Sequence, residues 1–320
     1  MRKSTRLWLI VAGTLVVLGL LICLGAMATM KWNFSLLSFP KHTLNTHQIT
    51  EAFTDISIST RTSDVVLVPS DGDGVTVECY ESKGLSHTVS VEDGVLTVKL
   101  SDTRKWYERL SFGFAKPKVT VSLPAGEWGA LGISLSTGDV TLPEHFSFDS
   151  VTLQASTGDV DLRASSRGAV KITASTGDLS LTGVGAASLE LSVSTGKIQL
   201  SQVRCTGNLS MSASTGKAIL TDVTCNNLTS KADTGDLLMT EVIASGTATL
   251  ERDTGDVTLA GCDAAELFIT TDTGDVRGTL KSDKVFLART DTGHVDVPKT
   301  VTGGRCEITT DTGDIRLSVE

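Results

Sequence analysis

The chain has 320 residues and a formal net charge of −9, and only 5 % of its residues are aromatic. This acidic balance argues against nucleic-acid binding, because contact with phosphates needs a basic surface. The 30 glycines and the scarcity of aromatic side chains disfavour one large conventional core. They favour many short strands built from aliphatic residues and threonine.

An uncharged apolar segment, residues 7–30, follows a short stretch, residues 1–6, that contains three basic residues. As a helix it would be about 36 Å long, enough to cross a hydrocarbon core of about 30 Å. We therefore expect a single transmembrane helix in the cell membrane, with residues 1–6 in the cytoplasm and the C-terminal domain extracytoplasmic. A cleaved signal peptide ending near residues 26–28 is the alternative, and both interpretations export the chain.

The next segment, residues 31–50, shows no clear periodicity and is interpreted as a juxtamembrane linker. Residues 51–130 alternate apolar and polar residues between turn signals, and they predict a β-rich N-terminal cap. Ile56 and Ile58 resemble the start of a degenerate first copy of the repeat that follows, with Ser63 where the repeat has glycine. Such a cap would cover an edge that could otherwise pair with other chains.

A repeat of 19–20 residues dominates the chain from residue 131 to residue 320. Its motif is Ser/Asp-Thr-Gly followed by Asp, Lys or His, as in residues 136–139 and 311–314. Ten copies at nearly fixed spacing are typical of a repeat architecture. The repeat glycines are Gly138, Gly158, Gly177, Gly196, Gly216, Gly235, Gly255, Gly274, Gly293 and Gly313.

Apolar residues alternate on both sides of each glycine, which predicts two short strands meeting at a Thr-Gly corner. One unit cannot bury its apolar face alone, whereas stacked units bury a continuous column. We therefore expect an all-β fold: a parallel β-solenoid, or β-helix, of about ten coils over residues 131–320. At about 4.8 Å per coil it would be roughly 50 Å long. A β-prism or another antiparallel β-repeat is the alternative.

The acidic residues of the corner allow two interpretations. Ser or Asp two positions before the glycine can accept a backbone hydrogen bond in a turn, and the corner threonines are expected to point inward as a hydroxyl ladder. Alternatively, stacked carboxylates in the last five copies bind Ca²⁺, which prefers oxygen ligands. The spacing matches neither an EF-hand loop nor the calcium-binding nonapeptide repeat. Apart from Ca²⁺, no cofactor is expected. The calcium candidates are Asp233, Asp236, Asp253, Asp256, Asp272, Asp275, Asp311 and Asp314.

Other chemistry-bearing residues give weaker signals. Cys205 and Cys225 occupy equivalent places in adjacent copies, within reach of a disulfide, although the geometry of parallel neighbours is often poor for one. Cys262 and Cys306 fall at apolar repeat positions, so they are expected as buried thiols. The basic and aromatic stretch 104–118 is interpreted as a hairpin that covers the cap, with contact to anionic lipid or a cell-wall polymer as the alternative. The five histidines are scattered and are expected at the surface, and no catalytic motif is present.

The repeats and the segment 131–139, which follows the strand-like run 119–124, resemble the bacterial β-strand-repeat putative-adhesin domain of unknown function. This domain occurs in membrane-anchored envelope proteins, including LiaG-like proteins linked to cell-envelope stress systems. The resemblance covers roughly residues 50–320 and carries over no catalytic residues. It implies a bacterial envelope location and an adhesin-like or regulatory role.

We therefore expect a non-enzymatic scaffold or surface interaction module anchored in the membrane. An envelope-stress regulator acting through a membrane partner is the alternative, and a polysaccharide-acting enzyme is the least favoured, because the acids follow the repeat and aromatic sugar platforms are scarce. The expected partners are the membrane, an envelope protein or a cell-surface polymer. The chain ends at Glu320 directly after a repeat strand, and this predicts an exposed edge suited to end-on self-association.

Overall fold

The computed structural model describes residues 3–29, 42–82, 84–103 and 117–320. The chain divides into two compact units, Met1–Lys41 and His42–Glu320.

The first unit contains one helix, α1 (Lys3–Thr29). Among the residues that the structure describes, no helix is both long enough and apolar enough to cross a membrane. The transmembrane helix expected over residues 7–30 is therefore not supported.

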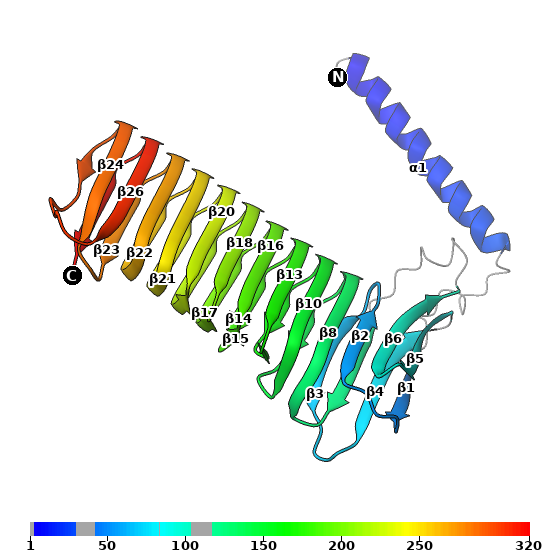
Figure 1. Cartoon of the computed structure of the whole chain (residues 1–320). Coiled ribbons are helices and arrows are strands. Elements are labelled where there is room, and N and C mark those ends of the chain that lie inside the picture. The colour runs from blue at the N-terminus through cyan, green and yellow to red at the C-terminus, as the bar shows by residue number, and fades with distance from the viewer. Residues whose placement is uncertain (1–2, 30–41, 83, 104–116) are drawn as a thin grey trace. The chain divides into compact units, whose positions relative to one another are not determined.

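The second unit is a rod of β-coils that starts with a cap (Figure 1). β1 pairs antiparallel with β4, so residues 42–49 belong to the cap and not to the expected linker 31–50. Their own sequence lacks a strand pattern, and their pairing with β4 defines the strand. The strands of the cap are β1 (His42–Ile49), β2 (Asp55–Ser59), β3 (Asp64–Pro69), β4 (Val75–Ser82), β5 (Leu85–Glu92), β6 (Val95–Asp102) and β7 (Lys118–Leu123).

The cap already contains the first coil of the solenoid. β2 pairs in parallel with the strand before the first repeat glycine, and Ile56 lies opposite Leu131. Past the corner, Val65 lies opposite Val140 in the same way. The degenerate first copy predicted around Ser63 is thus confirmed.

The repeat region contains the remaining twenty strands, and those of successive coils pair in parallel. This confirms the parallel β-solenoid of about ten coils and excludes the antiparallel alternative for residues 131–320. The strands are β8 (Gly126–Thr137), β9 (Val140–Leu142), β10 (Phe146–Thr157), β11 (Val160–Leu162), β12 (Ser165–Ser166), β13 (Ala169–Thr176), β14 (Leu179–Thr182), β15 (Gly185–Ala186), β16 (Ser188–Thr195), β17 (Ile198–Cys205), β18 (Asn208–Thr215), β19 (Ala218–Cys225), β20 (Asn227–Thr234), β21 (Leu237–Thr254), β22 (Val257–Thr273), β23 (Val276–Leu280), β24 (Lys284–Thr292), β25 (Val295–Asp296), β26 (Gly304–Thr312) and β27 (Ile315–Val319).

Each corner needs glycine for a steric reason. At Gly216 the backbone φ is +154°, and a Cβ atom would lie 1.8 Å from the carbonyl oxygen of Gly196 in the adjacent coil. No side chain fits between two backbones that approach so closely. The corner is therefore fixed by packing between coils as well as by the local turn.

The core is a continuous column of aliphatic side chains that runs from the cap through the coils. Equivalent positions stack in register, as Leu189 does on Val170 and Leu209. Full burial of one such leucine contributes roughly 1.5–3 kcal/mol. Because every coil repeats these contacts with its two neighbours, stability is distributed along the whole rod.

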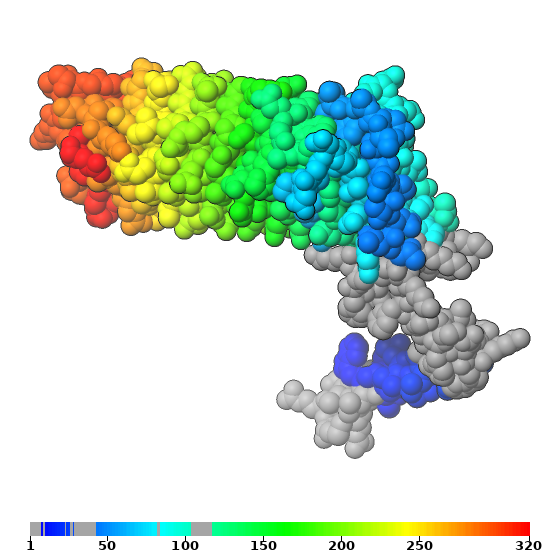
Figure 2. All heavy atoms as spheres, turned by 90° about the horizontal axis from the view of Figure 1, so that it is seen from below, coloured from blue at the N-terminus to red at the C-terminus, as the bar shows by residue number. Residues whose placement is uncertain are grey.

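The last two copies do not stack in chain order. β22 pairs with β26 and β23 pairs with β27, while β24 pairs with β26 and β25 pairs with β27. The final copy is therefore inserted between the coil of Asp272 and the coil of Asp291. Figure 1 shows β26 (red) between β22 and β24 (orange), and in Figure 2 the orange atoms extend beyond the red ones at this end of the rod.

Candidate functional site

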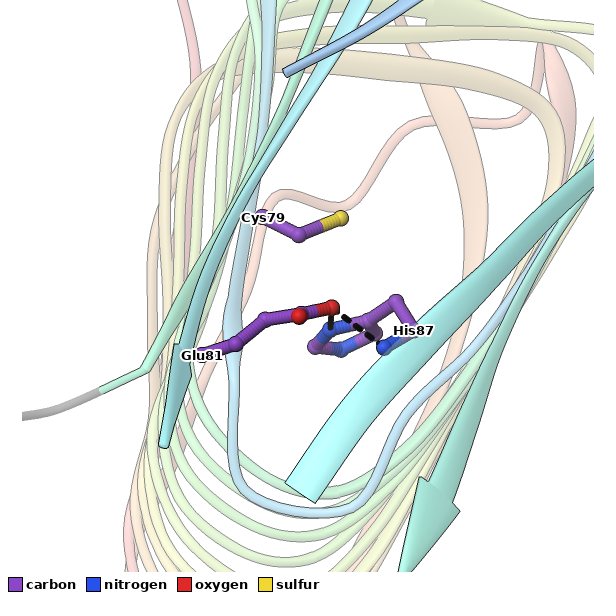
Figure 3. A group of neighbouring side chains, drawn as sticks. All are labelled: Cys79, Glu81 and His87. Atoms are coloured by element: carbon purple, nitrogen blue, oxygen red, sulfur yellow. Dashed lines mark hydrogen bonds and ion pairs between the residues drawn. The ribbon is translucent and has the colours of Figure 1, made fainter. Parts of the chain in front are cut away.

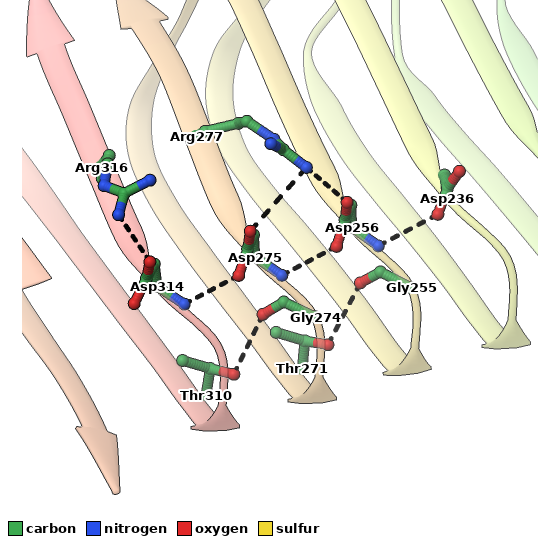
Figure 4. A network of polar contacts seen from close by, with 10 residues as sticks. All are labelled: Asp236, Gly255, Asp256, Thr271, Gly274, Asp275, Arg277, Thr310, Asp314 and Arg316. Atoms are coloured by element: carbon green, nitrogen blue, oxygen red, sulfur yellow. Dashed lines mark hydrogen bonds and ion pairs between the residues drawn. The ribbon is translucent and has the colours of Figure 1, made fainter. Parts of the chain in front are cut away.

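The aspartates that follow a corner glycine are part of a ladder between coils. The Oδ1 atom of each accepts a hydrogen bond from the backbone N–H of the equivalent residue in an adjacent coil, at 2.8–3.2 Å (Figure 4). The ladder already starts in the cap, where Asp64 accepts from Asp139. The donor and acceptor pairs continue as Asp159 to Asp139, Asp178 to Asp159, Lys197 to Asp178, Asp256 to Asp236, Asp275 to Asp256, Asp314 to Asp275 and His294 to Asp314.

These bonds define what the calcium candidates do in the structure. Asp236, Asp256, Asp275 and Asp314 each use Oδ1 in the ladder, and Asp256 and Asp314 also pair with Arg277 and Arg316. Asp233, Asp253, Asp272 and Asp311 are exposed. Within the described residues, these eight carboxylates form no group of three donor atoms within 4.8 Å of one another. The geometry favours the turn interpretation, and Ca²⁺ binding stays a prediction.

The corner threonines point outward, so the predicted inward hydroxyl ladder is wrong. The residue before each corner threonine has no partner in the parallel register. Ala155 and Thr157, for example, both pair with the adjacent coils, whereas Ser156 between them does not. This irregularity moves the following threonine to the exposed face. Buried hydroxyls occur two residues earlier, where Thr271 and Thr310 donate to the carbonyl oxygens of Gly255 and Gly274 (Figure 4).

The strongest candidate for an interaction surface is the coil at the end of the rod opposite the cap. We define this terminal coil as residues 284–303, comprising β24, β25 and the connection to β26. Among the described residues, β24 pairs only with β26, so its other edge has no strand partner. Six large hydrophobic side chains are exposed among the described residues of the second unit, and four lie in the terminal coil: Val285 (37 %), Leu287 (51 %), Val295 (36 %) and Val301 (88 %).

The charged side chains of β24 are already paired. Arg289 contacts Asp291 at 2.7 Å, and the buried ammonium of Lys284 contacts Asp263 at 2.6 Å. Desolvation opposes ionisation of Asp263, but hydrogen bonds from Lys284 and Ser282 lower its pKa below the ordinary value. An open groove of about 660 Å³ runs beside this pair. The edge of β24 therefore presents apolar side chains and backbone groups with its charges neutralised locally.

The position of the exposed edge corrects one sequence expectation. The final copy was expected to form the edge, but β27 is paired on both sides, with β23 and β25. Tandem copies are nearly equivalent in sequence, so their pattern does not specify which one is outermost.

The buried thiols expected in the solenoid are confirmed, whereas the expectation for the histidines is wrong at one position. Cys205 and Cys225 are free, buried thiols, and burial raises the pKa of Cys225 to about 12. Cys262 and Cys306 are buried as expected. His87 is only 7 % exposed, so the expectation that every histidine lies at the surface is wrong. The predicted hairpin 104–118 lies, except for its last two residues, outside the described residues.

Comparison with solved structures finds several similar chains of low sequence identity. A "putative adhesin" from Parabacteroides distasonis ATCC 8503 is 14 % identical, with 87 % of this chain and 98 % of that chain covered and a TM-score of 0.47. A "putative lipid binding protein" from the same organism is 13 % identical, with 88 % and 99 % covered and a TM-score of 0.44. A "putative adhesin" from Bacteroides fragilis NCTC 9343 is 13 % identical, with 88 % and 100 % covered and a TM-score of 0.35.

A comparison of the sequence with curated proteins gives no significant match. One protein family matches most of the chain in two overlapping segments, residues 53–213 and 205–320. These segments contain the degenerate first coil and all ten repeat corners, and the match confirms the resemblance to a β-repeat domain of unknown function. The chain therefore belongs to the Toastrack DUF4097 family.

Proposed function

We propose that this protein is a membrane-anchored, extracytoplasmic and non-enzymatic interaction module, whose terminal coil binds the terminal coil of a second copy. The observation that carries the proposal is the free edge of β24 together with its exposed side chains, Val285 and Leu287. An unpaired strand edge with apolar side chains and no unpaired charge is a template for pairing with another strand.

A second copy fits this edge by symmetry. Two β24 strands can pair antiparallel about a twofold axis, so that each surface contacts the same surface of its partner. With the axis at Phe286, Val285 lies opposite Leu287 of the partner, and Asp283 lies opposite Arg289. This register joins apolar with apolar and acidic with basic side chains. End-to-end pairing of rods carried on facing surfaces would make the module an adhesin.

The repeat acids support a structural role. Glycoside cleavage needs two carboxyl groups that are free to act as acid and as base or nucleophile. Here the aspartates that follow the corner glycine use one oxygen to bind the adjacent coil. The proposed anchoring rests on the sequence of residues 7–30, which carries no charge. Extraction of cell membranes with alkaline carbonate tests it, since an anchored chain stays in the membrane fraction.

The contact is tested by a photo-crosslinking amino acid at position 287 of the full-length chain in intact cells. We expect a product of twice the monomer mass. Leu287→Arg should abolish the dimer detected by light scattering of the detergent-solubilised chain. The matched control is Leu44→Arg, which alters another exposed leucine (55 %) on a cap strand at the opposite end of the rod and should leave the dimer intact.

The outcomes separate the candidate functions. A crosslink from position 287 to one different membrane protein would refute self-association and favour the regulatory alternative. The absence of any crosslinked product, with a monomer in solution, would overturn the proposed contact altogether.

A further inference from the structure

The cap contains a cluster of three side chains that none of the sequence motifs predicted. Cys79 and Glu81 are two residues apart on β4 and so point to the same face, toward the interior of the cap. His87 points toward them from β5 on the facing wall (Figure 3). One potential ligand atom from each residue lies within 4.8 Å of the other two.

All three residues are buried, with exposed fractions of 0 % for Cys79, 5 % for Glu81 and 7 % for His87. Glu81 accepts hydrogen bonds from Asn45 Nδ2, from the backbone N–H of His87 and, at 3.2 Å, from its ring Nδ1. The His87 side chain itself is 1 % exposed, and its Nε2 is buried without a hydrogen-bond partner among the described residues.

This hydrogen-bond pattern prepares His87 to bind a cation. Nδ1 of His87 lies 3.2 Å from Oε1 of Glu81, close to the separation of about 3.4 Å between two ligand atoms on one tetrahedral Zn²⁺. A cation between them would take the lone pair of Nδ1 in place of the hydrogen bond, with the proton of the neutral imidazole on Nε2.

The charges in the cluster also point to a divalent ion. Among the described residues, no Lys or Arg forms an ion pair with Glu81, and His87 is the only basic side chain that contacts it. A thiolate and a carboxylate carry two negative charges, which a divalent cation neutralises, whereas a buried carboxylate alone is costly. Sulfur, nitrogen and oxygen ligands together suit Zn²⁺ better than Ca²⁺ or Mg²⁺, which prefer oxygen ligands only.

We propose that the Cys79 thiolate, the Glu81 carboxylate and the His87 imidazole form a buried binding site for a thiophilic divalent cation, with Zn²⁺ as the best match. Three protein ligands leave the fourth tetrahedral position for water or an external ligand. Burial and the nearby charge of Glu81 raise the pKa of Cys79 to about 12, so the metal-free thiol is protonated. Binding breaks the S–H bond, forms a Zn–S bond and releases one proton.

The test uses the purified full-length chain in mild detergent, stripped with a chelator and titrated with Zn²⁺ or Co²⁺ alone. We expect binding of one equivalent, release of about one proton per Zn²⁺ at neutral pH, and a higher unfolding temperature. With Co²⁺ we expect the near-ultraviolet charge-transfer band of a cobalt–thiolate bond. This band reports directly on Cys79 and needs no variant.

Variants then assign the ligands. Cys79→Ala and His87→Ala should each weaken Zn²⁺ binding at least tenfold, and Cys79→Ala should abolish the thiolate band. Cys205→Ala is the matched control, because it removes another buried thiol in the solenoid and should leave both readouts unchanged. Circular dichroism verifies that each variant is folded. The proposal is overturned if the wild-type chain shows no cobalt–thiolate band, or if Zn²⁺ binding persists unchanged in the folded Cys79→Ala chain.

Discussion

The corner glycines offer the sharpest test of how the coils are held together, and Gly216→Ala is the most informative change. The new methyl group would lie 1.8 Å from the carbonyl oxygen of Gly196, and the backbone φ of +154° is strained for alanine. Ordinary contact requires about 3.4 Å, so one coil must move by more than 1 Å relative to the next.

The expected loss of stability can be worked out from the contacts around the corner. The unfavourable φ costs about 2 kcal/mol. Displacement of the corner from the coil of Gly196 weakens two hydrogen bonds between these coils, from Gly196 N–H to the Thr215 carbonyl at 3.0 Å and from Ile198 N–H to the Lys217 carbonyl at 3.0 Å. At about 1 kcal/mol each, they bring the total to about 4 kcal/mol. This is a large fraction of the stability of an ordinary domain, about 5–15 kcal/mol.

Urea unfolding followed by circular dichroism measures this loss as a lower midpoint. The control is Gly132→Ala on β8, where the new Cβ atom meets nothing closer than a carbonyl oxygen at 3.9 Å. That substitution should be neutral or stabilise the protein by up to about 1 kcal/mol, because alanine restricts the unfolded chain. If the two variants unfold within about 1 kcal/mol of each other, close backbone approach is not what fixes the corner.

Four further predictions concern charge and thiol chemistry. Asp263→Asn should lower the free energy of unfolding by about 3 kcal/mol at pH 7, because it removes the partner of the buried Lys284. The folded pKa of Asp263 lies below its unfolded value, about 3.9, so this contribution exists above the unfolded pKa and is lost as the pH falls through the folded pKa. The urea midpoints of variant and wild type should therefore converge in acid. Arg252→Met should raise the free energy of unfolding by about 1 kcal/mol, and with it the urea midpoint, because Arg252 is 2 % exposed and its Nε lacks a hydrogen-bond partner among the described residues. Cys205 and Cys225 should resist alkylation in the folded chain and react fully after unfolding without reductant, as mass spectrometry will show. Calorimetric titration of the full-length chain with Ca²⁺ should give no heat from the acidic corners, because their ladder oxygens already accept backbone hydrogen bonds.

Each of these predictions has a contrary outcome. If the difference in urea midpoint between Asp263→Asn and the wild type stays constant between pH 7 and pH 3, the ion pair is not the cause of that difference. A lower midpoint for Arg252→Met would mean that the bonds from Arg252 to Ser230 outweigh the burial of charge. If Cys205 and Cys225 are alkylated only after both denaturation and reduction, they form a disulfide. A saturable heat of Ca²⁺ binding would restore the calcium interpretation of the acidic corners.

The repeat corners could be predicted from the sequence because their cause is local and periodic. Glycine at a spacing of 19 or 20 residues is required wherever two backbones meet, and alternation of apolar residues specifies the buried face. The same logic identified the first coil from Ile56 and Ile58 despite Ser63 at the glycine position.

A second bend in the coils carries no comparable signal. Gln202, Asp222 and Glu241, each six residues after a corner glycine, adopt left-handed backbone conformations with φ between 53° and 56°. Different side chains occupy this position, so no residue type marks it. Here the contacts between coils override the weak local preference for glycine.

The buried cluster of the cap was invisible for a different reason. Cys79 and Glu81 share one strand, and their spacing alone indicates only a common face. His87 joins them because β4 and β5 separate after their turn and face each other across the interior. Such proximity depends on the paths of two strands, and a pattern along one strand does not encode it.

The insertion of β26 and β27 beneath the terminal coil has a consequence for the order of assembly. During synthesis, residues 284–296 emerge before residues 304–319, yet in the finished rod they lie outside them. The terminal coil can therefore reach its final position only after the last residues have emerged. A chain that stops before residue 304 would present the coil of Asp272 as the open template, and residues 284–296 could dock there instead. Residues 304–319 thus decide which surface the finished rod displays.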